Sequence, residues 1–160
     1  MRHYRIEIKW GILFSLMTLL WMIMERYVGL HDRFIHMHSY YTNFIAIPSI
    51  LLYFLALLDK RRAYYGGKMS YKKGFYTGLV ITLIVTLFAP IVQYVTSIYV
   101  TPEFFSNAIK YGVSTGKISH DEATSYFNLQ SYLLQSFVGA PIMGTITSAI
   151  VAVFTRKVDE

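Results

Sequence analysis

Four long runs of apolar residues, separated by short polar segments, dominate the pattern of the chain. An α-helix rises about 1.5 Å per residue, so about 20 residues cross a hydrocarbon core about 30 Å thick. Each run has about that length and carries few or no charges. The pattern predicts an all-α fold, an integral membrane four-helix bundle that forms a single transmembrane domain over residues 1–160. The predicted spans lie at about residues 8–28, 40–58, 75–100 and 131–155.

The polar segment between the third and fourth runs carries two helix-start patterns of its own. Thr101-Pro102-Glu103 has the order of an N-cap, a proline at the first helical position and an acidic first turn. Ser119 and Glu122 have the spacing of a capping box. We therefore expect a short amphipathic helical hairpin in this outer loop, with its second helix running directly into the fourth span. The two helices are expected at about residues 102–113 and 120–130.

The composition agrees with a membrane protein. Hydrophobic residues make up 54% of the chain and charged residues only 15%, against about 25% charged in an average soluble domain. A soluble chain of this length would lack the polar side chains to cover its surface. The absence of cysteine excludes disulfides and cysteine-ligated metal sites. No small-x-small cleavage site follows the first run, so we expect a retained span rather than a signal peptide.

Basic residues are distributed unevenly between the two sides that four spans create. Eleven lie on the side of the two termini, which the positive-inside rule makes cytoplasmic. They are Arg2, Arg5, Lys9, Lys60, Arg61, Arg62, Lys68, Lys72, Lys73, Arg156 and Lys157. The opposite side has Arg33, Lys110 and Lys117, with Arg26 at a helix end. We expect a multi-pass protein of the cytoplasmic membrane with both termini in the cytoplasm.

Six of these basic residues belong to the loop between the second and third spans, where tyrosines alternate with them. They are Lys60, Arg61, Arg62, Lys68, Lys72 and Lys73. The composition suits either topological retention or contact with anionic lipid headgroups. We expect no nucleic acid partner, because the loop is short and held at a membrane. Gly66-Gly67-Lys68-Met69 is not a P-loop, because the upstream glycine and the metal-binding hydroxyl are missing.

Small residues recur at every fourth position in the last two spans, a pattern typical of closely packed membrane helices. The third span has Gly74, Gly78, Thr82 and Thr86, and the fourth has Ser136, Ala140, Gly144, Ser148 and Ala152. Either the two rows pack against each other within one chain, or they form the seam of a homodimer.

Residue types that bind metals gather around the first outer loop. The candidates are Glu25, His31, Asp32, His36 and His38. Their spacing matches no established motif, and His36 and His38 share a face only if the segment is extended. The set is either a polar interfacial loop or a site for metal binding or pH sensing. If it binds zinc, replacing His36 and His38 should abolish binding.

Prolines interrupt three of the predicted spans, at Pro48, Pro90 and Pro141. Each removes a backbone donor and leaves a carbonyl for other groups to satisfy. Structural kinks and the polar midplane site of a carrier both use this pattern. No ionisable residue lies near the middle of a span, which argues against ion-coupled transport.

The order of several short segments resembles a bacterial family of small integral membrane proteins, domain of unknown function 4199. The segments are Glu7-Ile8-Lys9-Trp10-Gly11, Gly29-Leu30-His31-Asp32, Tyr41-Thr42-Asn43-Phe44-Ile45-Ala46-Ile47-Pro48, Leu58-Asp59-Lys60-Arg61, Gly67-Lys68-Met69 and Thr101-Pro102-Glu103-Phe104-Phe105. The resemblance covers nearly the whole chain and implies a bacterial inner-membrane protein. It implies no activity and no functional residues.

Three functions from different classes are compatible with these features. The first is a non-catalytic partner, scaffold or assembly component, because the packing rows occur without buried ionisable groups. The second is an oligomeric small-solute channel or carrier. The third is a metal-binding or pH-sensing protein that uses the outer histidines. We predict no enzymatic activity and no cofactor. The expected partners are the lipid bilayer and a second copy or a larger membrane complex.

Overall fold

The computed structural model describes residues 4–158, so Arg2 of the predicted basic set lies outside the described part. Within it, every regular element is helical. In chain order the elements are α1 (Arg5–Val28), α2 (Ile35–Tyr41), the 3-10 turn η2 (Thr42–Ile45), α3 (Ala46–Ala63), α4 (Tyr71–Val95), the π-helical turn η3 (Thr96–Val100), α5 (Phe104–Ser114), α6 (His120–Tyr126) and α7 (Leu129–Thr155). The predicted all-α fold is confirmed.

Four helical stretches are long and apolar enough to cross a membrane. They are Arg5–Val28, Ile35–Ala63, Tyr71–Val100 and Leu129–Thr155. Large apolar side chains cover their outward faces, as Leu20 on α1 and Phe154 on α7 illustrate, with 64% and 72% of their surface exposed. Contiguous apolar exposure of this extent is unusual for a water-soluble protein and suits contact with lipid.

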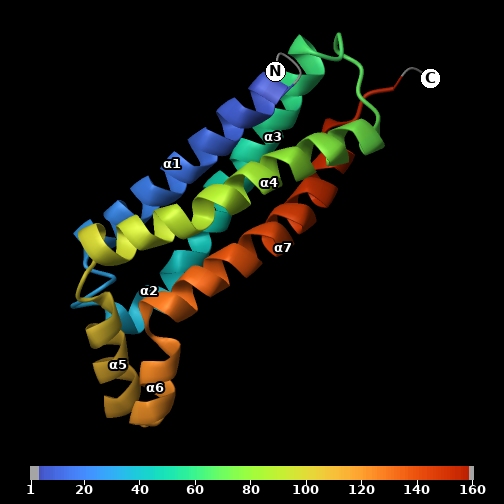
Figure 1. Ribbon diagram of the computed structural model, residues 1–160. Helices are drawn as coiled ribbons and strands as arrows, with labels where there is room; N and C mark the ends of the chain where they lie inside the picture. Colours follow the sequence, from blue (N-terminus) through green and yellow to red (C-terminus); the bar gives the residue numbers. More distant parts are fainter. Residues whose placement is uncertain (1–3, 159–160) are drawn as a thin grey trace.

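The long helices form a bundle in which α1, α4, α7 and α3 contact one another in that cyclic order. Figure 1 shows that α1 starts and α7 ends at the same end of the bundle, beside the α3–α4 connection. We call this the terminal end. Helices α2, α5 and α6 lie at the opposite end, called here the hairpin end. The even number of long helices accounts for the start of α1 and the end of α7 lying at the same end of the bundle.

Local sequence signals explain where several helices start and stop. Gly29 ends α1 in the left-handed conformation (φ 92°), and its amide donates to carbonyls of the last turn. Ser70 accepts from the Lys73 amide at the start of α4. At the start of α6, Ser119 and Glu122 form both bonds of the predicted capping box. These bonds satisfy backbone groups that a helix end leaves without partners.

The hairpin departs from expectation at both of its outer boundaries. The prediction that its second helix continues into the fourth span is wrong. Helix α6 ends at Tyr126, and the extended Asn128 accepts from the Ser131 amide (2.9 Å) and so starts α7 separately. Helix α5 begins at Phe104, not at residue 102. Residues 101–104 form a turn instead, in which the Phe104 amide donates to the Thr101 carbonyl (3.1 Å).

The second long helical stretch extends beyond the predicted 40–58 on both sides. It begins at Ile35, because α2 and η2 lead into α3 without a break, and it ends at Ala63. Pro48 lies in the first turn of α3, where its missing N–H needs no intrahelical acceptor. Pro90 and Pro141 lie inside α4 and α7, and both helices continue through their proline without a break.

Candidate metal centre and the helix interfaces

Three metal-ligand side chains meet at the hairpin end. Glu25 comes from the last turn of α1, His31 from the turn after it and His38 from α2. Each offers one ligand atom, and these atoms all lie within 4.8 Å of one another. The Glu25 carboxylate oxygen Oε2 is 3.0 Å from His31 Nε2 and 3.5 Å from His38 Nδ1. We call these three residues the Glu25 cluster.

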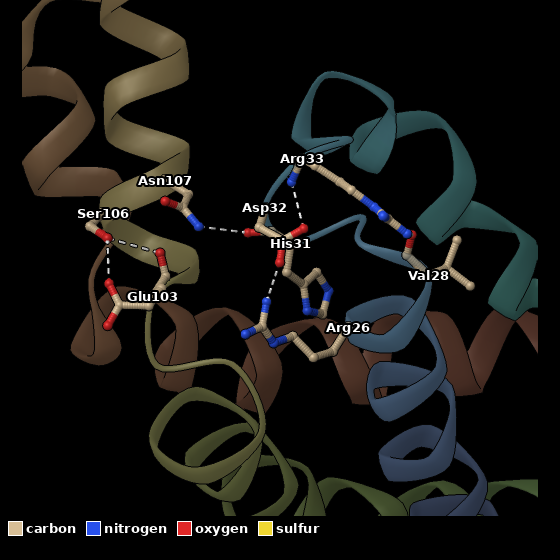
Figure 2. A network of polar contacts seen from close by, with 8 residues as sticks. All are labelled: Arg26, Val28, His31, Asp32, Arg33, Glu103, Ser106 and Asn107. Atoms are coloured by element: carbon tan, nitrogen blue, oxygen red, sulfur yellow. Dashed lines mark hydrogen bonds and ion pairs between the residues drawn. The ribbon is translucent and has the colours of Figure 1, made fainter.

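The chain reversal at Gly29 brings the Glu25 cluster together. Gly29 adopts a positive φ, and the Leu30 amide bonds back to the Glu25 carbonyl (2.9 Å). His31 is thereby folded against the end of α1. Helix α5 holds this turn from the other side, since the Asn107 side chain donates to the His31 carbonyl at 3.0 Å (Figure 2). Backbone contacts therefore fix the position of His31 independently of its ring.

Neighbouring side chains orient the ligands. Trp21, one turn earlier on α1, donates its indole N–H to the other Glu25 oxygen at 2.5 Å. The Phe104 ring of α5 packs against the rings of His31 and His38, with centroids 5.3 and 5.0 Å away. Metal sites depend on such outer contacts to hold their ligands in one orientation. The Glu25 and His31 side chains are completely excluded from solvent, whereas that of His38 is 20% exposed.

Two of the three ligand separations in the cluster fit a tetrahedral metal ion. Zinc binds histidine nitrogen and carboxylate oxygen at about 2.0–2.2 Å, which places neighbouring ligand atoms about 3.4 Å apart. The two separations from Glu25 Oε2, at 3.0 and 3.5 Å, bracket that value. Two histidines and one glutamate form a three-ligand zinc set that leaves the fourth position for water. The Nδ1 atom of His38 is buried without a hydrogen bond, as expected for an atom that a metal could use.

Two of the five predicted ligands lie outside the cluster. Asp32 is engaged by Arg26, and it also accepts from the Arg33 amide at 2.5 Å, as Figure 2 shows. That amide and the Arg26 guanidinium hold the pKa of the Asp32 carboxyl below its ordinary value. His36 is exposed beside Phe34. Residues two apart in the helical α2 point in different directions, so the extended segment that would bring His36 and His38 to one face is not present.

An apolar cavity of about 270 Å³ adjoins the cluster on the α5 side. His38 and Phe104 form part of its wall, with Tyr111 and Lys117 further along. A metal site needs an entry path. Since Glu25 and His31 are fully buried, His38 and this cavity provide the approach to the cluster from outside.

The two rows of small residues meet inside one chain. An added Cβ on Gly78 of α4 would lie 2.5 Å from the Ser148 hydroxyl of α7, and one on Gly144 of α7 would lie 2.5 Å from Thr82. Thr82 also bonds to the Tyr53 hydroxyl of α3 (2.8 Å). Gly74 faces Ala152 across the same interface, and Thr86 is buried on the same side of α4. Ser136 and Ala140 line a cavity instead.

The predicted basic loop residues divide into two groups. Arg62, Lys68, Lys72 and Lys73 are exposed at the terminal end. Arg61 is partly buried and donates to the Thr155 carbonyl at 2.8 Å, which joins α3 to α7. Lys60 lies inside α3 and is 1% exposed, so it is not available to lipid headgroups. Its ammonium forms a 2.8 Å ion pair with Glu7, which is also buried.

The sequence predicted that the rows of small residues occur without buried ionisable groups, and the second half of that expectation is wrong. Glu7 and Lys60 are buried at the terminal end, and Glu25 and His31 at the hairpin end. Sequence reasoning missed the Glu7–Lys60 pair because the two residues become neighbours only when α1 packs on α3. A weak signal exists in their type, since each is a charged residue near the end of an apolar run.

The fold and the cluster together define a class: an all-α protein with four membrane-length helices and a two-histidine, one-glutamate group at one end. The family model described as "Protein of unknown function (DUF4199)" matches residues 9–157. The chain belongs to this family. Neither the comparison with curated proteins nor that with solved structures finds a match.

Proposed function

We propose that this protein is a non-catalytic, multi-pass membrane protein that binds one zinc ion through Glu25, His31 and His38. The observation that carries the proposal is the convergence of three ligand atoms within 4.8 Å, two of them on fully buried side chains. A buried carboxylate is costly unless a positive partner or hydrogen bonds compensate it. A divalent cation compensates Glu25 and uses both histidine nitrogens at the same time.

The ion would connect three separate parts of the hairpin end. Glu25 belongs to α1, His31 to the following turn and His38 to α2, while Phe104 packs α5 on both histidine rings. Zinc occupancy therefore sets how firmly the hairpin of α5 and α6 is held against the bundle. A partner that recognises the hairpin would distinguish the zinc-bound from the zinc-free form, in keeping with a partner or assembly role.

We assign no catalysis to this centre. Zinc hydrolases place a general base beside the metal-bound water. In the described part of the chain, the only carboxylate of the metal-ligand group is Glu25, which would itself be a ligand. The oligomeric channel or carrier, and a homodimer or larger complex, remain predictions from the sequence.

We further propose that the terminal end faces the cytoplasm of a bacterial cell and the hairpin end faces outward. The exposed Arg62, Lys68, Lys72 and Lys73 at the terminal end support this orientation through the positive-inside rule. The zinc site then lies on the outer side of the membrane, where it samples the zinc concentration outside the cytoplasm.

Elemental analysis of the purified protein tests zinc binding. The protein is prepared in mild detergent without chelator, incubated with equimolar zinc and desalted. We expect one zinc per chain in the wild type, in His36→Ala and in Asp32→Asn, and less than a tenth of that in His38→Ala and Glu25→Gln. Helix content by circular dichroism confirms that each variant is folded. A wild-type protein without zinc, or a Glu25→Gln protein with a full equivalent, contradicts the proposal.

A further inference from the structure

Basic residues from two distant segments of the chain meet at the terminal end of the bundle. Met69, just before α4, and Lys157, just after α7, exchange backbone hydrogen bonds, and the amide of each donates to the carbonyl of the other at 2.8 Å. This antiparallel bridge holds the C-terminal segment against the α3–α4 connection (Figure 1). We call the exposed cations of these two segments the basic surface: Lys68, Lys72, Lys73, Arg156 and Lys157.

The described segments around the basic surface hold little negative charge. In residues 59–73 and 156–158 the one acidic residue is Asp59. Its carboxylate already accepts from the Lys9 ammonium at 2.5 Å and from the Trp10 indole at 2.7 Å. The cations of the basic surface therefore repel one another, and a bound anion relieves that repulsion.

Two of the cations occupy a position that the helix itself disfavours. Lys72 and Lys73 belong to the first turn of α4, and that turn contains no acidic residue. The start of a helix carries the positive end of its dipole, where anions are stabilising and cations are not. Ser70 caps this turn by accepting from the Lys73 amide, and the register of the bridge sets Arg156 opposite Ser70. A positive helix end with cations from two segments beside it favours a bound anion.

The position of the basic surface on the bundle indicates which anion reaches it. On α7, Val153 and Phe154 are 46% and 72% exposed, directly before Arg156. Tyr71 and Tyr76 are exposed on the first turns of α4. Exposed apolar side chains of this size suit the hydrocarbon of a membrane, and tyrosines are enriched where the hydrocarbon meets the headgroups. The basic surface therefore has the depth expected for contact with phospholipid phosphates.

Topological retention does not require this arrangement. Retention depends on how many basic residues a loop carries, not on their convergence with a distant segment. The Met69–Lys157 bridge and the two lysines in the first turn of α4 are features of the folded chain. We propose that the basic surface binds the phosphate of an anionic phospholipid, and that cations of α4 and of the C-terminal segment both contact the headgroup. The proposal depends neither on zinc nor on which side of the membrane the terminal end faces.

Native mass spectrometry of the purified protein tests this site. The full chain in mild detergent is titrated with dioleoyl phosphatidylglycerol, or with phosphatidylcholine of the same acyl chains, and the bound lipid is counted. We expect the anionic lipid to bind about tenfold more tightly or better, and this preference to fall as salt is raised. Glycerol 3-phosphate, which carries the phosphate without acyl chains, should not displace the lipid at the same concentration. Displacement would identify a site for soluble phosphates and overturn the lipid assignment.

Two double variants test whether both segments form the site. Lys72→Gln with Lys73→Gln should weaken phosphatidylglycerol binding about tenfold, and so should Arg156→Gln with Lys157→Gln. These changes leave the backbone bonds of the bridge and of the Ser70 cap in place. Unchanged helix content and unchanged phosphatidylcholine binding verify that each variant is folded. Wild-type affinity in either double variant overturns the proposal.

The matched control removes the same charge from the opposite end of the bundle. Lys110 and Lys117 are exposed at the hairpin end, so Lys110→Gln with Lys117→Gln should leave phosphatidylglycerol binding unchanged. A loss as large as in the terminal-end variants would show that only the total charge matters. That result, or equal affinity of the wild type for the two lipids, contradicts a specific site on the basic surface.

Discussion

The Glu25 carboxylate lies 3.0 Å from the His31 ring nitrogen, and neither side chain is exposed to solvent. Glu25 belongs to the last turn of α1, where the helix dipole disfavours negative charge. Burial and the dipole therefore both oppose an isolated carboxylate at this position. The Trp21 indole and the two histidines compensate in part, and a bound cation compensates most directly.

Zinc should stabilise the folded protein against heat. A ligand present at about 100 times its dissociation constant adds about 2.7 kcal/mol to the free energy of unfolding. For a chain of this size, such a gain corresponds to an increase in Tm of roughly 5–10 °C. The Tm in detergent, measured with zinc and with a chelator, gives this difference.

The controls for this thermal shift follow from the positions of the histidines. His36→Ala should retain the full shift, because His36 is exposed and outside the cluster. His38→Ala should show little or none. Equal shifts in the two variants would mean that zinc acts elsewhere on the protein.

Breaking the buried ion pair at the terminal end should destabilise the bundle strongly. Lys60→Met leaves the Glu7 carboxylate buried without its 2.8 Å partner, and an uncompensated buried charge costs about 3–5 kcal/mol. The double variant Glu7→Met with Lys60→Met should recover most of the loss, because two apolar side chains need no compensation. Reversible unfolding in mixed detergent measures these free energies.

The matched control is the exposed pair at the same end of the bundle. Lys9 and Asp59 are 2.5 Å apart, with side chains 52% and 28% exposed. Lys9→Met should therefore cost less than about 1 kcal/mol. A double variant as unstable as Lys60→Met alone would show that the buried pair does not account for the loss.

Enlarging Gly78 should separate α4 from α7. The added methyl group of Gly78→Ala would lie 2.5 Å from the Ser148 hydroxyl and 3.2 Å from its Cα, too close for either to remain in place. Overpacking of this kind costs about 1–3 kcal/mol. Gly139→Ala on α7 is the control, since no atom lies within 4 Å of its added methyl group. The unfolding free energies of the two variants should differ by at least 1 kcal/mol, and equal values would contradict close packing at Gly78.

The start of α6 should weaken in acid. The Ser119 amide and hydroxyl donate to Glu122 at 2.9 and 2.7 Å, and these bonds lower the pKa of its carboxyl. A lowered pKa means that the stabilisation is complete above the ordinary glutamate range and is lost as the pH falls through the folded value. Amide hydrogen exchange of residues 119–126 should therefore accelerate below about pH 4.5 relative to α5. Glu122→Gln should remove this pH dependence. If exchange in that variant accelerates in acid as it does in the wild type, the prediction is contradicted.

Local patterns were sufficient for the helices but not for every boundary. Four apolar runs of membrane length leave little choice of fold, because backbone groups in lipid must bond within their own helix. The capping box at Ser119 was equally readable. The break at Asn128 was missed, because a single polar residue between two helix-forming segments does not reveal whether its backbone is helical or extended.

The Glu25 cluster was predictable in part. The histidine and acidic residues indicated that a metal site could lie near the first outer loop. Which of them are ligands depends on two backbone conformations that the spacing of residues in the sequence does not reveal. The positive φ of Gly29 folds His31 back on α1, and the helical α2 turns His36 away from His38. The Glu7–Lys60 pair depends on the packing of α1 against α3. Such contacts between distant residues follow from tertiary structure alone.

X-ray absorption at the zinc edge of the purified, zinc-loaded protein tests the central claim most directly. We expect one zinc per chain with nitrogen and oxygen neighbours at about 2.0–2.2 Å and the imidazole scattering of two histidines. His38→Ala should lose the metal, while His36→Ala should match the wild type. A spectrum of fully hydrated zinc in the wild type, or one unaltered by both Glu25→Gln and His38→Ala, would contradict the assignment of the Glu25 cluster as a metal centre.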